Sequence, residues 1–249
     1  MKRILVICFI HILFFTFLFS QENDHSGGGN FLKRIEYNKR IWEHNYNFDS
    51  KGDVEKLFYG DFNAPVEFFF SPSSVYVPEV PCGFRIVKDT LNKTFTLEIK
   101  YISNFREALK EAYSMYPLIA STSIIPVTDD RDPIRIQNRE NIKKASEAVL
   151  KLYTVDSRSF SVSYPFAEKL YNKMVSLIAN FKARGIPPGI EDGYSVTFRT
   201  VVDDEVWSLR IHMPTGTALK MSDICRQMIK DAKNNQMDEA IFIKLLDDF

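Results

Sequence analysis

Two segments in which apolar and polar residues alternate, 83–101 and 194–213, constrain the fold of this chain more than any other feature. In the second, "YSVTFRTVVDDEVWSLRIHM", aromatic and aliphatic residues alternate with polar ones on both sides of an acidic pair, and the alternation is interrupted only near that pair. Successive side chains of a strand point to opposite faces, so this pattern predicts an antiparallel hairpin with one apolar face. A turn at the acidic pair sets Ser195 opposite His212 on the polar face.

The polar face of this hairpin carries the candidate binding residues of the chain. They are Ser195, Arg199, Arg210 and His212. The register predicts that this face is exposed to solvent, because the aromatic face is the one that would be buried. A serine nucleophile needs a general base, a carboxylate behind that base and donors for an oxyanion, and only the base is visible here. We therefore predict no catalytic residue, and interpret this face as either a polar contact surface or a solvated one.

The first hairpin resembles the second closely enough to indicate an internal duplication. The segment "FTLEIK" (95–100) matches "WSLRIH" (207–212) in residue character at each position. Its register sets Arg85 against Glu98, a favourable cross-strand pair. Any two amphipathic hairpins would share part of this similarity, so coincidence remains the alternative.

If the duplication is real, the chain has an α+β fold built from two related β-ββ-α units. We place them at 31–137 and 138–249, each a small antiparallel sheet packed under helices, with a single compact domain as the alternative. Helices are predicted over 31–47, 105–116, 139–153, 166–184, 218–233 and from 238 onward, and further strands over 63–73 and 157–165. Asn104 is predicted to cap the second of these helices.

Residues 1–20 have the composition of a secretory signal peptide. Lys2 and Arg3 precede a long apolar run that ends near Ser20, and this order is typical of cleaved signals. An uncleaved N-terminal membrane anchor is the alternative, since the run is almost long enough to cross a bilayer. We expect an exported chain, periplasmic or secreted, with a flexible lead-in over 21–30 and no membrane span in its mature part.

Charge and cysteine content exclude several classes of site. Removing the signal lowers the number of basic residues from 32 to 30, against 32 acidic ones, which excludes the strongly basic surface that nucleic acids require. Cys82 and Cys225 remain in the mature chain, and form either one disulfide or two separate thiols. With so few histidines beside them, they cannot supply the usual ligands of zinc, so we predict no metal and no cofactor.

The sequence predicts function only as a class. Export, balanced charge and abundant aromatic residues without a convergent catalytic set favour a binding protein of the cell envelope over an enzyme. Its partner would be a protein, a peptide or an envelope polymer. One alternative is a secreted hydrolase that uses two carboxylates distant in sequence. Another is a structural or assembly subunit that pairs through the edges of its sheet.

Overall fold

The computed structural model describes eight stretches of the chain: 32–38, 52–60, 64–72, 77–89, 94–119, 132–181, 193–202 and 205–249. For residues 32–38 only the backbone is described. The predicted signal peptide and lead-in, and the tips of both hairpins, lie outside these stretches. The described residues form two compact units, which we treat separately. The helical unit comprises the described residues of 103–154, and the sheet unit comprises all the others.

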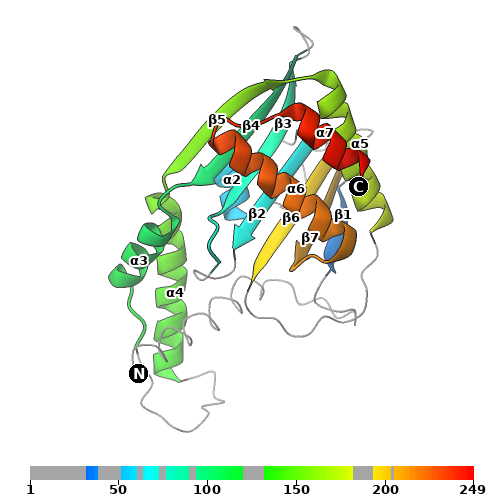
Figure 1. Ribbon diagram of the computed structural model, residues 1–249. Coiled ribbons are helices and arrows are strands. Elements are labelled where there is room, and N and C mark those ends of the chain that lie inside the picture. The colour runs from blue at the N-terminus through cyan, green and yellow to red at the C-terminus, as the bar shows by residue number, and fades with distance from the viewer. Residues whose placement is uncertain are drawn as a thin grey trace. The chain divides into compact units, whose positions relative to one another are not determined.

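The sheet unit contains one antiparallel sheet of seven strands (Figure 1). Their bounds are β1 Leu32–Asn38, β2 Val66–Pro72, β3 Cys82–Asp89, β4 Thr94–Ile102, β5 Val155–Val162, β6 Tyr194–Val202 and β7 Glu205–His212. Their order across the sheet is β1-β7-β6-β2-β3-β4-β5. Because β2 pairs with β3 on one side and β6 on the other, the two hairpins share one continuous sheet instead of forming two small ones.

Both hairpins have the register that their alternation predicts. In β3 and β4, Arg85 lies opposite Glu98 and donates a hydrogen bond from Nε to its carboxylate at 2.5 Å. In β6 and β7, Ser195 lies opposite His212. A shift of one residue would turn every apolar side chain to the other face, so burial of one face fixes the register.

Three helices cover the apolar face of the sheet: α5 (Tyr164–Asn180), α6 (Gly216–Lys233) and α7 (Glu239–Asp247) (Figure 1). The core between them is built from Phe68, Phe84, Leu97, Ile99, Phe198 and Leu209 of the strands and from Phe166, Leu170, Met174, Met221, Met228 and Phe242 of the helices. Helix α5 begins where the Ser163 hydroxyl accepts a hydrogen bond from the Phe166 N–H, as an N-cap does. This arrangement of helices on an antiparallel sheet confirms the predicted α+β class.

A short helix that we did not predict, α2 (Asp53–Tyr59), lies on the opposite, polar face of the sheet. It packs through Phe58 and Tyr59, whose ring centroids lie 6.3 and 5.6 Å from that of Phe69 in β2. Gly83 stands opposite Phe69 in β3 and leaves room for this contact. A Cβ on Gly83 would lie 2.9 Å from the Phe69 ring and 2.7 Å from the carbonyl oxygen of Phe68.

At the edge of the sheet next to β7, the structure contradicts the predicted helix over 31–47. Residues 32–38, predicted to begin a helix, form the strand β1, which pairs antiparallel with β7 and sets Ile35 opposite Leu209. The stretch "RIEYN" alternates polar and apolar residues, and pairing satisfies backbone groups of β7 that would otherwise be open. The helix prediction is wrong over these residues, and 39–47 lie outside the described chain.

The helical unit is an antiparallel pair of helices, α3 (Phe105–Met115) and α4 (Pro133–Leu152). The predicted helix after the first hairpin therefore packs on α4. Asn104 is the N-cap residue of α3, as predicted, and its carbonyl accepts from the N–H of Ala108 at 2.9 Å, but its side chain makes no capping hydrogen bond. Instead, the Asn104 amide donates to the carbonyl of Leu152 at 2.8 Å and accepts from the N–H of Thr154 at 2.7 Å. The duplication stays a prediction, and the boundary it implies after residue 137 falls within α4.

Candidate functional site

The predicted site residues lie on the polar face of the sheet, but this part of the face is not exposed to solvent. Ser195 and Arg199 are buried, with exposed fractions of 6% and 0%, while Arg210 and His212 are half-buried. The prediction of an exposed face is wrong for the first two. Helix α2 brings Glu55 onto Arg199 and its neighbour Thr197, and Ser195 lies between the paired residues Ser71 of β2 and His212 of β7. The candidate surface is therefore largely internal.

Arg199 is held by two carboxylates from different parts of the chain. Its guanidinium donates to Glu55 of α2 and to Glu67 of β2, each at 2.9 Å. Glu55 also accepts from the hydroxyl of Thr197 at 2.9 Å, and Glu67 from the N–H of Ala64 at 3.0 Å. Burial alone would lower the pKa of Arg199, but the two carboxylates outweigh it and raise that pKa.

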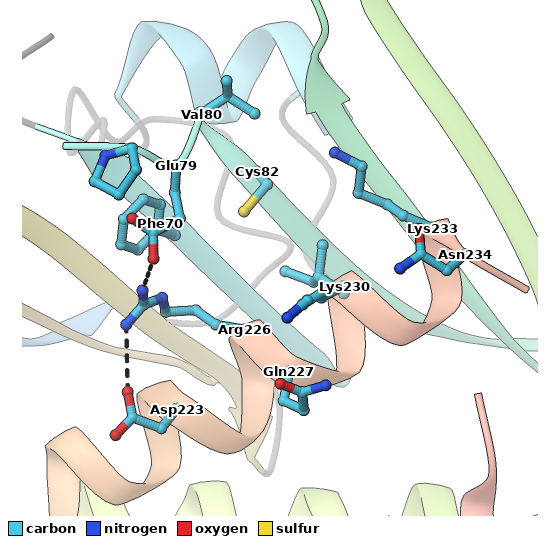
Figure 2. A pocket seen from close by; sticks show the side chains of 12 residues that line it. Phe70, Glu79, Val80, Cys82, Asp223, Arg226, Gln227, Lys230, Lys233 and Asn234 are labelled. Carbon is cyan, nitrogen blue, oxygen red and sulfur yellow. Dashed lines mark hydrogen bonds and ion pairs between the residues drawn. The ribbon is translucent and has the colours of Figure 1, made fainter. Parts of the chain in front are cut away.

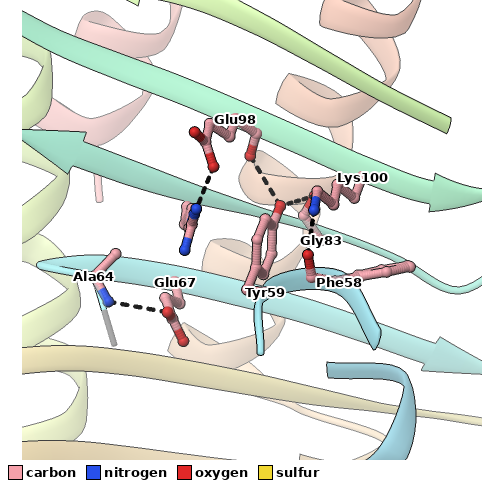
Figure 3. Close-up of polar contacts among 8 residues, drawn as sticks. Phe58, Tyr59, Ala64, Glu67, Gly83, Glu98 and Lys100 are labelled. Atoms are coloured by element: carbon pink, nitrogen blue, oxygen red, sulfur yellow. Dashed lines mark hydrogen bonds and ion pairs between the residues drawn. The ribbon is translucent and has the colours of Figure 1, made fainter. Parts of the chain in front are cut away.

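The same polar face continues across β3 and β4 around Tyr59 (Figure 3). The Tyr59 hydroxyl donates to the backbone carbonyls of Gly83 at 3.2 Å and Glu98 at 2.9 Å. The guanidinium of Arg85 lies 4.8 Å from the centroid of the Tyr59 ring, and the ammonium of Lys100 lies 5.1 Å from it. Lys100 in turn donates to the carbonyl of Phe58. These contacts fasten α2 to the sheet, since each of them joins the helix to a strand.

Alternating charges cross the sheet in one row on this face. The paired positions run Arg199, Glu67, Arg85 and Glu98 through β6, β2, β3 and β4. Opposite charges at directly paired positions stabilise a sheet. Because each charge meets its opposite inside the structure, we assign this cluster to stability and not to ligand binding.

The Ser195 and His212 side chains are close, with Ser195 Oγ 3.3 Å from His212 Nδ1. The distance is compatible with a weak hydrogen bond. However, a nucleophile must also be reachable by substrate, and Ser195 is buried. Neither residue lines the pocket on the other face of the sheet. The two side chains are therefore as close as those of a catalytic dyad, but a substrate could not reach the Ser195 hydroxyl.

A pocket of about 700 Å³ lies on the other face of the sheet unit, between α6 and the residues leading into β3 (Figure 2). Its floor is formed by the buried residues Phe70, Cys82 and Ile229. Its rim is polar and consists of Glu79, Asp223, Arg226, Gln227, Lys230, Lys233 and Asn234, together with Pro78 and Val80. An apolar floor under a few polar groups is the usual composition of a small-molecule site, and the volume falls within the range of such sites.

One end of this pocket is organised by Arg226. Its guanidinium forms ion pairs with Glu79 and, at 3.3 Å, with Asp223 (Figure 2). It lies 4.9 Å from the ring centroid of Phe70 and 5.2 Å from that of Tyr194. Burial lowers the pKa of Arg226 and raises that of Asp223. The guanidinium is therefore fixed by two carboxylates and two rings, so the geometry of this end is preorganised.

The other end of the pocket carries Lys230 and Lys233 (Figure 2). The Lys233 ammonium lies 3.8 Å from the ring centroid of Tyr101. Between the two ends lies Cys82, whose thiol pKa burial raises to about 12, against a smaller opposing effect of Lys233. Cys82 and Cys225 are both buried free thiols, so the structure has the separate thiols and not the disulfide that one interpretation allowed.

The sequence alone does not reveal this pocket, although the helical spacing of some rim residues is visible in it. The predicted helix over 218–233 corresponds to α6, and its rim residues Asp223, Arg226, Lys230 and Lys233 recur at helical spacing. The opposing wall comes from the proline-rich residues before β3. Nothing in the pattern indicated that this segment would face α6, because the order of the strands was not known.

Comparisons of the chain with protein families, with curated proteins and with solved structures found no match. Within the part of the chain that the structure describes, no three or more His, Cys, Asp or Glu side chains are grouped so that they could hold a metal ion. None of the described helices is both long enough and apolar enough to cross a membrane. The fold and the pocket therefore define the class, an α+β protein with a preformed cleft under α6.

Proposed function

We propose that this chain is an exported binding protein whose ligand occupies the pocket under α6. The observation that carries the proposal is a pocket of about 700 Å³ with a buried apolar floor and a charged rim. A cleft with these properties is the default location of a ligand in a protein of this kind. The ligand would be a small molecule, or a short part of a peptide, a protein or an envelope polymer.

The rigidity of the pocket supports binding over a purely structural role. Its floor residues belong to β2, β3 and α6, and all three elements are anchored in the core. A site built on such elements needs little reordering when a ligand enters, so little affinity is lost to conformational entropy. An assembly subunit would have no need of a preformed cleft.

The proposal is tested with Nile red, a neutral dye whose fluorescence rises in apolar surroundings. Gln227 is exposed at the rim, so Gln227→Trp should fill the pocket without disturbing the core. The matched control is Lys220→Trp, an exposed position of α6 outside the pocket. We expect the wild type and the control to bind the dye and Gln227→Trp to lose most of this binding. Equal binding by all three proteins would contradict the proposal.

A secreted hydrolase is the second candidate function, because two carboxylates share one end of the pocket. Glu79 and Asp223 both bind Arg226, and burial raises the pKa of Asp223, as is expected of a general acid. The arginine opposes this role, since its ion pairs engage both carboxylates, which would have to be free to exchange a proton with a substrate. Mass spectrometry of a captured ligand decides between the two functions, because a binding protein returns its ligand unchanged.

A further inference from the structure

We propose that the ligand of this pocket is an amphipathic anion. Its acidic group would bind Lys230 and Lys233, and its apolar part would lie over the floor formed by Phe70, Cys82 and Ile229. This inference rests on the proposed function and adds the chemical class of the ligand. It follows from how the charges are distributed along α6.

The charged rim residues of α6 form one stripe along the helix. Asp223, Arg226, Lys230 and Lys233 are separated by three, four and three residues, which places them on the same helical face. At a rise of 1.5 Å per residue, Asp223 and Lys233 are about 15 Å apart along the axis. The stripe therefore has two distinct ends, and an elongated ligand would meet both.

The end that contains Arg226 is not free to bind an anion. Its positive charge is already matched by Glu79 and Asp223, and these three side chains together carry a net charge of −1. An acidic group placed here would be repelled by the second carboxylate. The apolar floor residue Phe70 lies beside this end, under the Arg226 guanidinium. An anion would thus direct its apolar part toward Phe70 and its charge away from it.

The end that contains the two lysines carries two positive charges that no acidic side chain of the described residues pairs with. Among the described residues the Lys230 ammonium makes no ion pair or hydrogen bond, and the Lys233 ammonium contacts only the ring of Tyr101. Of the described residues that line the pocket, only Glu79 and Asp223, at the opposite end, are acidic. Two cations three residues apart on a helix repel each other. A bound carboxylate would remove this repulsion and gain two charge-assisted hydrogen bonds.

The side chains of the two lysines are not needed as hydrogen-bond donors to the last carbonyl groups of α6. Asn235 adopts a left-handed conformation with φ of 56°. Its N–H bonds to the carbonyl of Ala232 at 3.1 Å, and the N–H of Gln236 bonds to the carbonyl of Asp231 at 2.8 Å. This pair of bonds is a Schellman motif, which satisfies carbonyls that a helix leaves open at its C-terminus. The two ammonium groups thus remain available to a ligand.

The test compares octanoate, octanol and acetate as competitors of Nile red. A merely apolar pocket would prefer octanol, which loses less hydration than octanoate on burial. We expect octanoate to displace the dye at a concentration at least about tenfold lower than octanol or acetate, a difference of about 1.4 kcal/mol. The double variant Lys230→Gln/Lys233→Gln should weaken octanoate binding about tenfold and leave octanol unchanged.

Two further variants separate charge recognition from a general effect on the helix. The matched control Lys220→Gln removes an exposed lysine of α6 outside the pocket, and should leave all three affinities unchanged. Asp223→Asn removes a negative charge from the rim, and should tighten octanoate binding by roughly two- to fivefold.

The inference is overturned if wild-type protein binds octanol as tightly as octanoate, or if the double variant keeps full octanoate affinity. Acetate binding equal to that of octanoate would overturn the amphipathic part, since the apolar chain would then contribute nothing. Each of these results can occur while Nile red still binds, in which case the proposed function stands. Failure of Nile red itself to bind the pocket would instead remove the proposed function.

Discussion

At the scale of single residues, Arg199 is the largest fully buried side chain among the described residues. Its position opposite Ser208 in the second hairpin follows from the alternation of that segment, and the structure confirms it. Its burial could not be predicted in the same way. The partners Glu55 and Glu67 come from an unpredicted helix and from a strand whose neighbours in the sheet the pattern does not specify.

Substitution of Arg199 should be strongly destabilising. Arg199→Met leaves Glu55 and Glu67 as buried carboxylates without their cation, and such a loss costs about 3–5 kcal/mol. The triple variant Glu55→Gln/Glu67→Gln/Arg199→Met removes the charges together and should recover most of that stability. Urea unfolding followed by tryptophan fluorescence measures both. A loss below about 1 kcal/mol in the single variant would show that the cluster is not buried as described.

Ser195→Ala is expected to leave ligand binding intact. Ser195 is buried and outside the pocket, and its contact with His212 is long at 3.3 Å. Loss of one such hydrogen bond costs about 1 kcal/mol. Nile red titration and thermal unfolding of the variant test this together. Loss of binding with an unchanged melting temperature would give the Ser195 and His212 pair a functional role that its burial argues against.

The two buried cysteines should be inert to alkylation while the protein is folded. Thiolate is the reactive form, and burial raises the pKa of Cys82 to about 12 and that of Cys225 well above its usual value. At pH 8 the Cys82 thiol is therefore almost entirely protonated. Iodoacetamide labelling, quantified by peptide mass spectrometry, should be slow for both at pH 8 and fast in guanidinium. Rapid labelling of Cys82 in folded protein would contradict the burial of its thiol.

At the scale of elements, long periodic segments were predicted well and short ones were not. The helices α5 and α6 each have several turns, and both hairpins contain many alternating apolar and polar residues. The period of the apolar residues is therefore unambiguous in each of them. Helix α2 has seven residues, too few to show a period, and β1 alternates only over 34–38. Helix α2 covers part of the polar face and β1 pairs with the edge of the sheet at β7. Without α2, the alternation alone predicts that the polar face is exposed.

The contact of α2 with the sheet depends on the absence of a side chain at Gly83. A Cβ there would lie 2.7 Å from the Phe68 carbonyl oxygen and 2.9 Å from the Phe69 ring. Gly83→Ala must therefore push β2 or Phe69 away, and overpacking of this kind costs about 1–3 kcal/mol. The control Lys88→Ala changes an exposed residue of the same strand and should stay within about 0.5 kcal/mol of wild type. Equal unfolding free energies for the two variants would refute this account.

At the scale of the whole molecule, β2 decides the architecture of the sheet unit. The sequence shows two similar hairpins about 110 residues apart, and similarity alone predicts two separate small sheets. Pairing of β2 with both β3 and β6 joins them instead. The same pairing brings Glu67 between Arg199 and Arg85, and it places Phe70 beside α6 as part of the pocket floor. Strand order is a long-range property, so neither the cluster nor the pocket could be derived from local alternation.

A single sheet should lose both hairpins together when its central strand is weakened. Phe68 of β2 is fully buried between Phe84 of β3 and Phe198 of β6, with ring centroids 5.7 and 5.5 Å away. Phe68→Ala should cost about 3–5 kcal/mol, and hydrogen exchange should show the same loss of protection in β3–β4 as in β6–β7.

The matched control is Phe105→Ala, because Phe105 is a buried residue of the helical unit. It should lower protection in α3 and α4 by more than in the strands of the sheet unit. If Phe68→Ala instead reduced protection in only one hairpin, the two hairpins would unfold independently. The protein would then behave as two duplicated units in contact, and the continuous sheet would have no role in its cooperativity.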